Sequence, residues 1–344
     1  MKAHFKPYTL NFKRASGTSR GILHTKETYF IIIENDEKKG VGECNMFKGL
    51  SIDDRPGFLE KLQWTCDHIY VGLEKLLLEL TAFPSMQFGL EQAFLSLESK
   101  HPFELFQNDF TASKKSIPIN GLIWMGSKEF MHQQIKEKLK AGFSTIKLKI
   151  GAIDFKAELD LLQYIRSEFS AVEVELRVDA NGAFSPENAL EKLKRLSEFD
   201  LHSIEQPIRQ GQWQEMAALC SRTPLPIALD EELIGVFSVT KQQELLQTIQ
   251  AQYIILKPAL VGGFKGCEGW IAMAEKQQMK WWVTSALESN IGLSAIAQWT
   301  FGLGNSMPQG LGTGALYTNN ISCPLEVSKG ALEYTTKDNW DFKL

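Results

Sequence analysis

From residue 117 onward, short apolar runs alternate with longer stretches in which apolar residues recur at helical spacing. Short apolar runs bounded by turn residues are typical of buried strands, and the helical period is typical of helices that pack on them. The expected strands lie in IPINGLIWM (117–125), STIKLKIG (144–151), VEVELRVDANG (172–182), HSIEQP (202–207), PIALDEE (226–232), YIILKP (253–258), WWVTSA (281–286) and QGLGTG (309–314). About eight strand–helix units predict parallel pairing and favour a closed barrel of the α/β class over an open doubly wound sheet.

The first third of the chain lacks this rhythm. Its pattern predicts a strand over 3–12, a polar loop over 14–26, further strands over 28–35 and 41–44, and helices over 56–80 and 84–98. Hairpin-like strands followed by helices indicate a separate, smaller α+β domain.

Bulk composition narrows the class of protein. Hydrophobic residues make up 44% and charged residues 23% of the 344 positions, a balance typical of globular proteins, and the net charge of −4 comes without a block of one sign. We therefore expect neither a nucleic-acid partner nor a membrane-binding face. The five cysteines are odd in number and form no CxxC pair, which predicts neither a zinc site nor a disulfide framework: Cys44, Cys66, Cys220, Cys267 and Cys323. The N-terminus does not resemble a signal peptide, so a cytoplasmic location is expected.

Charged residues interrupt the apolar strands at matching places. Lys147 and Lys149 are alternate residues of one strand and therefore lie on the same face. Later strands end in Asp179, Glu205, Asp230 and Lys257, at intervals of 25 to 30 residues, which is one strand–helix unit each. A barrel gathers the carboxyl ends of its strands around one mouth, so these side chains are expected to form one site.

The residue types at this mouth indicate its chemistry. Asp179, Glu205 and Asp230 would repel one another unless they shared a cation, and oxygen ligands favour Mg²⁺, with Mn²⁺ as a possible substitute. Lysines on both sides of such a metal suit removal of a proton from the carbon beside a carboxylate, and the positive charges of Mg²⁺ and Lys147 favour Lys149 as the base. Asn181 and Glu231 either support the metal ligands or are simply solvated.

The chain at this point resembles the enolase superfamily, specifically its muconate-lactonizing subgroup. The resemblance rests on K-x-K at Lys147–Lys149, VDAN at Asp179, EQP at Glu205, DE at Asp230 and the lysine at 257, and it covers nearly the whole length. It implies a (β/α)7β, TIM-like barrel over 114–317 and an α+β capping domain over 1–113, with the 318–344 tail packing back on that domain.

Further segments are similar to the o-succinylbenzoate synthases, the dehydratases of menaquinone biosynthesis within this subgroup. These are GVGECNMFKGLS (40–51), PSMQFGLEQA (84–93), INGLIWMG (119–126), SALES (285–289) and GLGTG (310–314). The resemblance implies that Lys149 removes the α-proton of a cyclohexadiene carboxylate and then protonates the departing hydroxyl, while Lys257 stabilises the enediolate as a cation. It also implies that residues 18–26 close over the site, and that the succinyl arm is held by Ser285, Ser289, Gly312 and Thr313.

Other activities share the same five charged positions. Dipeptide epimerases usually carry an acidic D-x-D on the eighth strand, which GLGTGALYTNN (310–320) lacks, whereas N-acylamino acid racemization and muconate cycloisomerization stay open. A Schiff-base barrel would leave three carboxylates without a purpose, and a non-catalytic descendant would be expected to lose one of the five residues. Both a monomer and a homodimer are compatible with the sequence.

Overall fold

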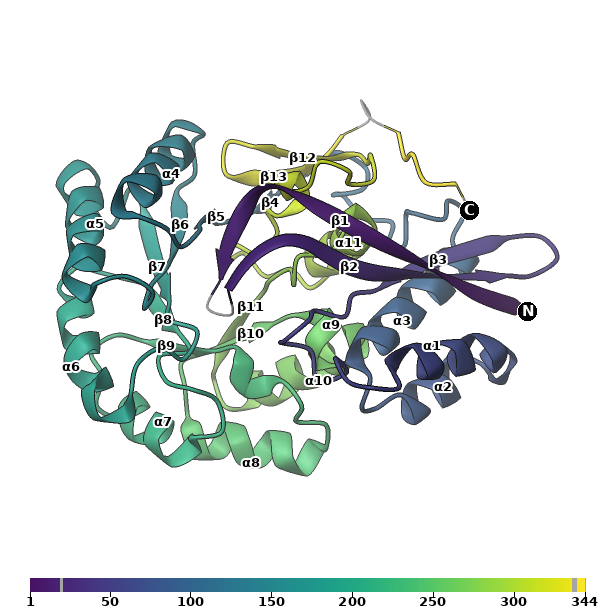
Figure 1. The fold of residues 1–344 in the computed structure, drawn as a ribbon, viewed down its shortest axis with the longest axis horizontal. Helices are drawn as coiled ribbons and strands as arrows, with labels where there is room; N and C mark the ends of the chain where they lie inside the picture. The colour runs from purple at the N-terminus through teal and green to yellow at the C-terminus, as the bar shows by residue number, and fades with distance from the viewer. Residues whose placement is uncertain (19–20, 336–338, 344) are drawn as a thin grey trace.

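The computed structural model describes residues 1–18, 21–335 and 339–343 of the chain. In this part, seven parallel strands form one curled sheet in the order β11-β10-β9-β8-β7-β6-β5, with helices along its outside (Figure 1). The strands are β5 (Gly121–Ile123), β6 (Thr145–Lys149), β7 (Glu175–Asp179), β8 (Ser203–Glu205), β9 (Ile227–Leu229), β10 (Tyr253–Leu256) and β11 (Lys280–Val283). The helices between and after them are α4 (Lys128–Lys140), α5 (Phe155–Glu168), α6 (Pro186–Ser197), α7 (Trp213–Cys220), η2 (Glu231–Leu233), α8 (Val239–Ile249), α9 (Pro258–Val261), α10 (Gly263–Lys276) and α11 (Asn290–Gly302). The alternation of strands and helices expected from the apolar pattern is confirmed.

The two edges of the curled sheet are bridged by residues 309 and 310. Gly310 forms a parallel bridge with Thr284, just after β11, and Gln309 forms one with Ile119, just before β5. The amide of Asn120 donates to the carbonyl of Gln309 over 3.0 Å, and the amide of Gly310 donates to that of Val283 over 2.8 Å. The segment expected to close the strand series therefore lies between the first and the last strand of the sheet.

The two faces of each sheet strand have different environments. Ile146 and Leu148 of β6 belong to the main apolar cluster, and Lys147 and Lys149, which alternate with them in sequence, face the other way. This alternation follows from the two-residue period of a strand. It places the apolar side chains against the outer helices and leaves the inner face for charged groups.

Two helix boundaries follow the turn chemistry of the sequence. Helix α6 begins at Pro186 after Ser185, as expected, although the Ser185 side chain makes no capping hydrogen bond. Gly142, two residues after the end of α4, has φ of +80°, the left-handed conformation that a glycine adopts most easily after a helix.

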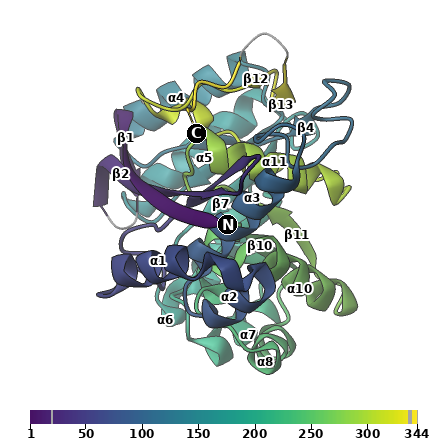
Figure 2. The ribbon, with the colours of Figure 1, turned by 90° about the vertical axis from the view of Figure 1, so that its right-hand side faces the viewer.

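The N-terminal third forms an antiparallel sheet in the order β1-β2-β3 and a group of helices, seen from their own side in Figure 2. The elements are β1 (Lys2–Thr18), β2 (Gly21–Glu34), β3 (Lys39–Cys44), α1 (Phe58–Asp67), η1 (Ile69–Val71), α2 (Leu73–Glu79) and α3 (Pro84–Glu98). The prediction of a loop over 14–26 is wrong for most of that range. Ser16–Thr18 pair with Gly21–Leu23 after a register shift and extend the hairpin. Residues 19 and 20, which belong to the segment expected to close over the site, lie outside the described residues.

Strand β3 and helix α3 approach each other closely through glycines. A β-carbon on Gly42 would lie 1.9 Å from the carbonyl oxygen of Gly89, and one on Gly89 would lie 2.4 Å from the sulfur of Cys44. No side chain fits there, so the GVGEC segment depends on glycine for this packing.

The C-terminal segment contacts two parts of the molecule. After η3 (Gly314–Leu316), strands β12 (Leu325–Ser328) and β13 (Ala331–Tyr334) pair with each other, and β13 also pairs with β4 (Ile117–Pro118). The ring of Phe342 packs edge-on against Phe30 of β2, with 5.0 Å between ring centroids. Residues 336–338 and 344 of the predicted tail lie outside the described residues. Within the described ranges no helix has the length and apolarity of a membrane span, and the five cysteines are free thiols.

Candidate active site

The charged residues predicted from strand ends lie side by side in the curled sheet. Lys149 at the end of β6 is the register partner of Asp179 at the end of β7, and Asp179 is in turn the partner of Glu205 at the end of β8. Asp230 and Lys257 directly follow β9 and β10. The three carboxylates are almost fully buried, with 0%, 3% and 2% of Asp179, Glu205 and Asp230 exposed, so their charges must be balanced locally.

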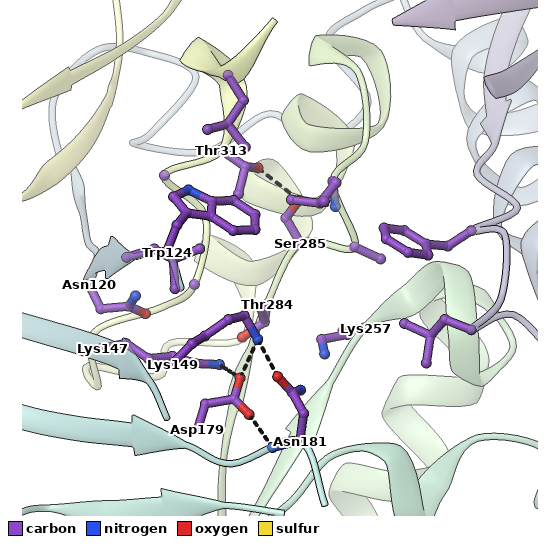
Figure 3. Close-up of a pocket in the computed structure, with 18 of the residues that line it drawn as sticks. Asn120, Trp124, Lys147, Lys149, Asp179, Asn181, Lys257, Thr284, Ser285 and Thr313 are labelled. Carbon is purple, nitrogen blue, oxygen red and sulfur yellow. Dashed lines mark hydrogen bonds and ion pairs between the residues drawn. The ribbon is translucent and has the colours of Figure 1, made fainter. Parts of the chain in front are cut away.

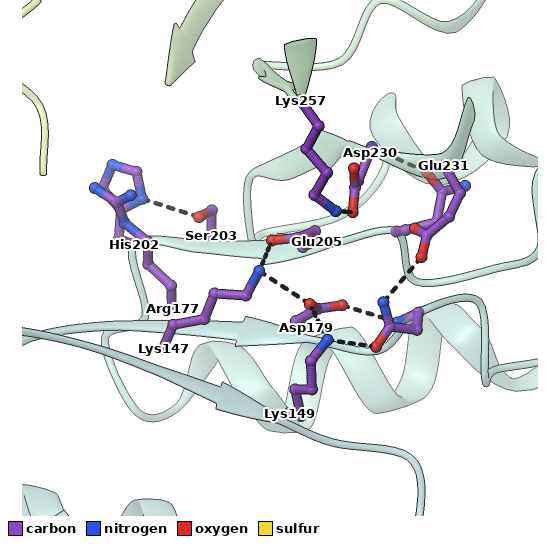
Figure 4. Close-up of polar contacts among 12 residues, drawn as sticks. Lys147, Lys149, Arg177, Asp179, His202, Ser203, Glu205, Asp230, Glu231 and Lys257 are labelled. Atoms are coloured by element: carbon purple, nitrogen blue, oxygen red, sulfur yellow. Dashed lines mark hydrogen bonds and ion pairs between the residues drawn. The ribbon is translucent and has the colours of Figure 1, made fainter. Parts of the chain in front are cut away.

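Lysine side chains balance the charges of these carboxylates through ion pairs (Figure 4). Lys147 Nζ lies 2.9 Å from Asp179 Oδ2 and also pairs with Glu205 Oε2. Lys149 Nζ lies 2.8 Å from the same Asp179 oxygen, and Lys257 pairs with Asp230. All six residues predicted as catalytic or metal-binding are therefore joined in adjacent ion pairs.

Asn181 connects Lys149 to Glu231. Its side-chain oxygen accepts a hydrogen bond from Lys149 Nζ over 2.7 Å, and its side-chain nitrogen donates to Glu231 Oε1 over 2.9 Å. Its own amide donates to Asp179 Oδ1, and its φ of +44° turns the chain sharply after β7. The two residues predicted as supports thus touch the lysine and carboxylate groups and are not simply solvated.

The ion pairs and the burial shift the pKa values of these groups in different directions. Burial works against a charged Asp179, but Lys147 and Lys149 hold its pKa well below the usual range. Burial, reinforced by the charge of Asp179, raises the pKa of Glu205 well above its ordinary value. Burial would lower the pKa of Lys257, but the carboxylates of Asp230, Glu205 and Glu231 together raise it above its ordinary value. Lys257 is therefore held as a cation.

The three carboxylates are candidate ligands for a metal ion. Among the described residues, no group of three or more acidic, His or Cys side chains stands in an arrangement that could hold a metal directly. The ammonium groups of Lys147 and Lys257 lie among the carboxylates instead, and the buried oxygen Oε1 of Glu205 has no hydrogen-bond partner in the described part of the chain. The hard oxygen donors fit Mg²⁺ in kind, provided that they exchange their lysine contacts for the ion.

A cavity of about 1030 Å³, counted with its open mouth, lies over these groups (Figure 3). Its wall combines the lysines and Asp179 with apolar side chains and a few hydroxyl and amide groups, which is typical of small-molecule sites. The lining residues are Phe47, Leu50, Asn120, Leu122, Trp124, Lys138, Phe143, Lys147, Lys149, Asp179, Asn181, Glu231, Lys257, Thr284, Ser285, Ala286, Leu287, Gly310, Gly312, Thr313 and Leu316.

Three of the four residues predicted to hold the substrate arm line this cavity. The Thr313 hydroxyl donates to Ser285 Oγ over 2.8 Å, and the Ser285 hydroxyl donates to Glu288 Oε2 over 2.6 Å, with Gly312 beside them in the wall. The fourth residue, Ser289, corrects this prediction, because it does not line the cavity. Its hydroxyl donates to Glu43 and accepts from the amide of Ile291, so it caps the start of α11.

A buried polar network adjoins the cavity wall at Ser285 and was not predicted from the sequence. Lys26 of β2 donates to Asn45 Oδ1, and Asn45 Nδ2 donates to Glu288 Oε1 over 2.9 Å. Glu43 of β3 accepts from Thr28 and from the amides of Ser289 and Gly292. The available signal was a glutamate in each of two segments, Glu43 in GVGEC and Glu288 in SALES.

Comparisons with known proteins agree with this geometry. Residues 131–337 match the family model described as enolase C-terminal domain-like. The chain is also 47% identical to the o-succinylbenzoate synthase of Desulfotalea psychrophila over 96% of this chain and 98% of the relative. The chain belongs to the o-succinylbenzoate synthase family of the enolase superfamily.

Two solved structures are similar to this chain in fold. The crystal structure of MenC from Desulfotalea psychrophila has a TM-score of 0.86 and 44% identity over 97% of this chain and 99% of that one. A dipeptide epimerase of Enterococcus faecalis, complexed with Mg and the dipeptide L-Leu-L-Tyr, has a TM-score of 0.81 at 20% identity, over 96% of each chain, and shows similarity of the fold alone. The o-succinylbenzoate synthases are lyases, and members of their superfamily use Mg²⁺.

Proposed function

We propose that this chain is an o-succinylbenzoate synthase. It removes water from 2-succinyl-6-hydroxy-2,4-cyclohexadiene-1-carboxylate by syn elimination and forms 2-succinylbenzoate, a step of menaquinone biosynthesis. The observation that carries the proposal is the near full-length similarity to a dehydratase of this activity together with the complete set of strand-end charges.

Lys149 is assigned both proton transfers. As a neutral amine it takes the proton from C1, which leaves an enediolate, and as an ammonium it gives the same proton to the hydroxyl that departs from C6. The C–H and C–O bonds break on one face of the ring, so one group serves both steps and water is released. Asp179 and Asn181 hold the Lys149 nitrogen in place for this role.

Lys257 is assigned an electrostatic role. Its raised pKa, set by three surrounding carboxylates against the opposing effect of burial, keeps it positively charged. A fixed cation near the developing negative charge stabilises the enediolate without exchanging a proton.

Asp179, Glu205 and Asp230 are assigned as the ligands of Mg²⁺, with Mn²⁺ as a substitute. When bound, the ion supplies positive charge that stabilises the enediolate at the substrate carboxylate. Lys147 contacts two of these ligands, Asp179 and Glu205. Asn181 and Glu231 orient Lys149, and Ser285, Gly312 and Thr313 form the wall for the succinyl arm.

The same proposal extends to the architecture. Residues 309 and 310 are assigned as the eighth strand of a (β/α)7β barrel that spans 114–317, supported by the two parallel bridges. Residues 1–113 are assigned as the capping domain, and the 318–344 tail is assigned to it on the contact of Phe342 with Phe30. A cytoplasmic location and the oligomeric state stay predictions.

The alternative is an N-acylamino acid racemase or dipeptide epimerase with the same two lysines. The same strand-end residues are compatible with it, but the absence of an acidic pair in GLGTGALYTNN (310–320) counts against an amino-group substrate.

A spectrophotometric assay tests the main proposal. With Mg²⁺ and the cyclohexadiene substrate, the protein is expected to form the aromatic product, and Lys149→Ala is expected to abolish its formation. Lys194→Ala, at an exposed ion pair on α6, is the control. Efficient racemization of N-acylamino acids without dehydration would overturn the assignment.

A further inference from the structure

Asn120 is a cavity residue to which the site chemistry above gives no role. It lies in the extended segment between β4 and β5, and its backbone amide donates to Gln309. Asn120, Leu122 and Trp124 are alternate residues on one face of the chain, and all three line the cavity. Only 5% of Asn120 is exposed.

The side-chain amide of Asn120 makes no hydrogen bond with any of the described residues. Neighbouring buried amides are satisfied: Gln309 accepts from the amide of Val283 over 2.7 Å and donates to the carbonyl of Met307 over 2.6 Å. The Asn120 amide atoms are also not among the fully enclosed polar atoms without partners, so they face the cavity space. An amide that faces the cavity in this way is free to donate a hydrogen bond to a ligand in the cavity.

The surroundings restrict which part of a ligand reaches Asn120. Leu122 is the register partner of Lys147 in β6, so Asn120 lies two residues deeper on the strand beside the K-x-K lysines. Figure 3 shows its amide on the Lys147 side of the cavity, apart from the Ser285–Thr313 pair. A ring whose reacting carbon lies at Lys149 can therefore reach Asn120 through a substituent on a neighbouring ring carbon.

We propose that Asn120 Nδ2 donates a hydrogen bond to the keto oxygen of the substrate's succinyl arm. This inference rests on the proposed function. The keto group is bonded to the ring carbon adjacent to the one that carries the carboxylate, and it is a neutral acceptor that suits a neutral donor. The charged carboxylate of the ring is matched by the lysines instead. Asn120 is then a binding residue that fixes the orientation of the ring relative to Lys149.

Two ligands that differ only at this oxygen test the inference. The first is the product, 2-succinylbenzoate, and the second is 4-(2-carboxyphenyl)butanoate, in which a methylene replaces the keto group. Their dissociation constants are measured by isothermal titration calorimetry with Mg²⁺ present, for the wild type and Asn120→Leu. The wild type is expected to bind the keto ligand more tightly than the butanoate. In Asn120→Leu, the dissociation constant of the product is expected to rise on the order of tenfold, and that of the butanoate is expected to change less than about twofold.

Thr284→Val is the matched control, because Thr284 also lines the cavity and the substitution removes one hydroxyl at nearly constant volume. It is expected to keep the preference for the keto ligand. Equal weakening of both ligands by Asn120→Leu would mean a structural role, and loss of the preference in Thr284→Val alone would move the donor to Thr284. Either result overturns the inference.

The same measurements separate this inference from the proposed function. A wild type that forms and binds 2-succinylbenzoate, together with an Asn120→Leu variant that keeps the preference, overturns the role of Asn120 alone. A wild type that neither forms nor binds 2-succinylbenzoate overturns both.

Discussion

Lys149 and Asp179 face each other across neighbouring parallel strands, and Lys149 Nζ lies 2.8 Å from Asp179 Oδ2. The register of β6 and β7 therefore brings the assigned base into contact with an assigned metal ligand. The base is positioned by the sheet itself and not by a flexible loop, which suits proton transfer at a defined distance.

Charge-conserving substitutions should distinguish the role of Lys149 from that of Lys257. Lys149→Arg is expected to lower the dehydration rate by about 10³-fold or more, because a guanidinium cannot give up its proton and act as a base. Lys257→Arg keeps the positive charge and is expected to retain activity within about 100-fold of wild type, whereas Lys257→Met is expected to lose more. Rates are measured from the absorbance of the aromatic product. An active Lys149→Arg beside an inactive Lys257→Arg would reverse the two assignments.

Removal of Mg²⁺ should abolish activity and lower the thermal stability. EDTA is expected to stop dehydration and Mg²⁺ to restore it. Mg²⁺ at about 100 times its dissociation constant should stabilise the fold by about 2.7 kcal/mol, measured as a rise in melting temperature. Asp230→Asn is expected to lose most of that rise, while Asp160→Asn, which is exposed and pairs with Lys128, is expected to keep it. An unchanged Mg²⁺ response in Asp230→Asn would remove Asp230 from the metal site.

Glu91 should make stability depend on pH. It lies on α3 and accepts hydrogen bonds from the amides of Phe264 and Lys265 at the start of α10. Burial raises the pKa of Glu91 from its ordinary 4.5 to about 7, even though these amides and Lys265 oppose the shift. The folded state thus holds the proton more tightly, so this group's stabilising contribution is fully present below pH 4.5 and is lost as the pH rises through 7.

Glu91→Gln removes this titration. We compare the free energy of unfolding of Glu91→Gln with that of the wild type at each pH. From pH 5 to pH 8, this difference is expected to shift in favour of the variant by up to about 3 kcal/mol. Chemical denaturation at several pH values measures it. Glu98→Gln, exposed at the end of the same helix, is the control. A difference that stays constant with pH would show that Glu91 does not titrate in this range.

Lys26 should be needed for the buried network between the first sheet and α11. Its pKa is lowered by burial, while the charges of Glu43 and Glu288 oppose that effect. Lys26→Met leaves these two buried carboxylates without their cation and is expected to destabilise the fold by about 3 kcal/mol. Adding Glu288→Gln should recover part of the loss. Urea unfolding of the single and double variants measures both effects, and a Lys26→Met protein of wild-type stability would contradict the prediction.

The sequence by itself determined the positions of the strands, because apolar runs and turn residues act over a few neighbouring positions. It also determined which strand ends carry Lys149, Asp179, Glu205, Asp230 and Lys257, since their spacing repeats with each strand–helix unit. The extension of the β1–β2 hairpin past Asn11 was not predictable, because its polar residues are held by pairing across the hairpin and not by an apolar pattern.

Contacts between distant segments were decided only by the tertiary structure. Ser289 is occupied by Glu43, which is 246 positions away, and Lys26 reaches Glu288 through Asn45. The Asn120 amide likewise faces the cavity without a partner among the described residues, which no local pattern indicates. Local patterns carry information about neighbours along the chain, whereas the pairing of buried polar groups depends on which segments the folded core brings together.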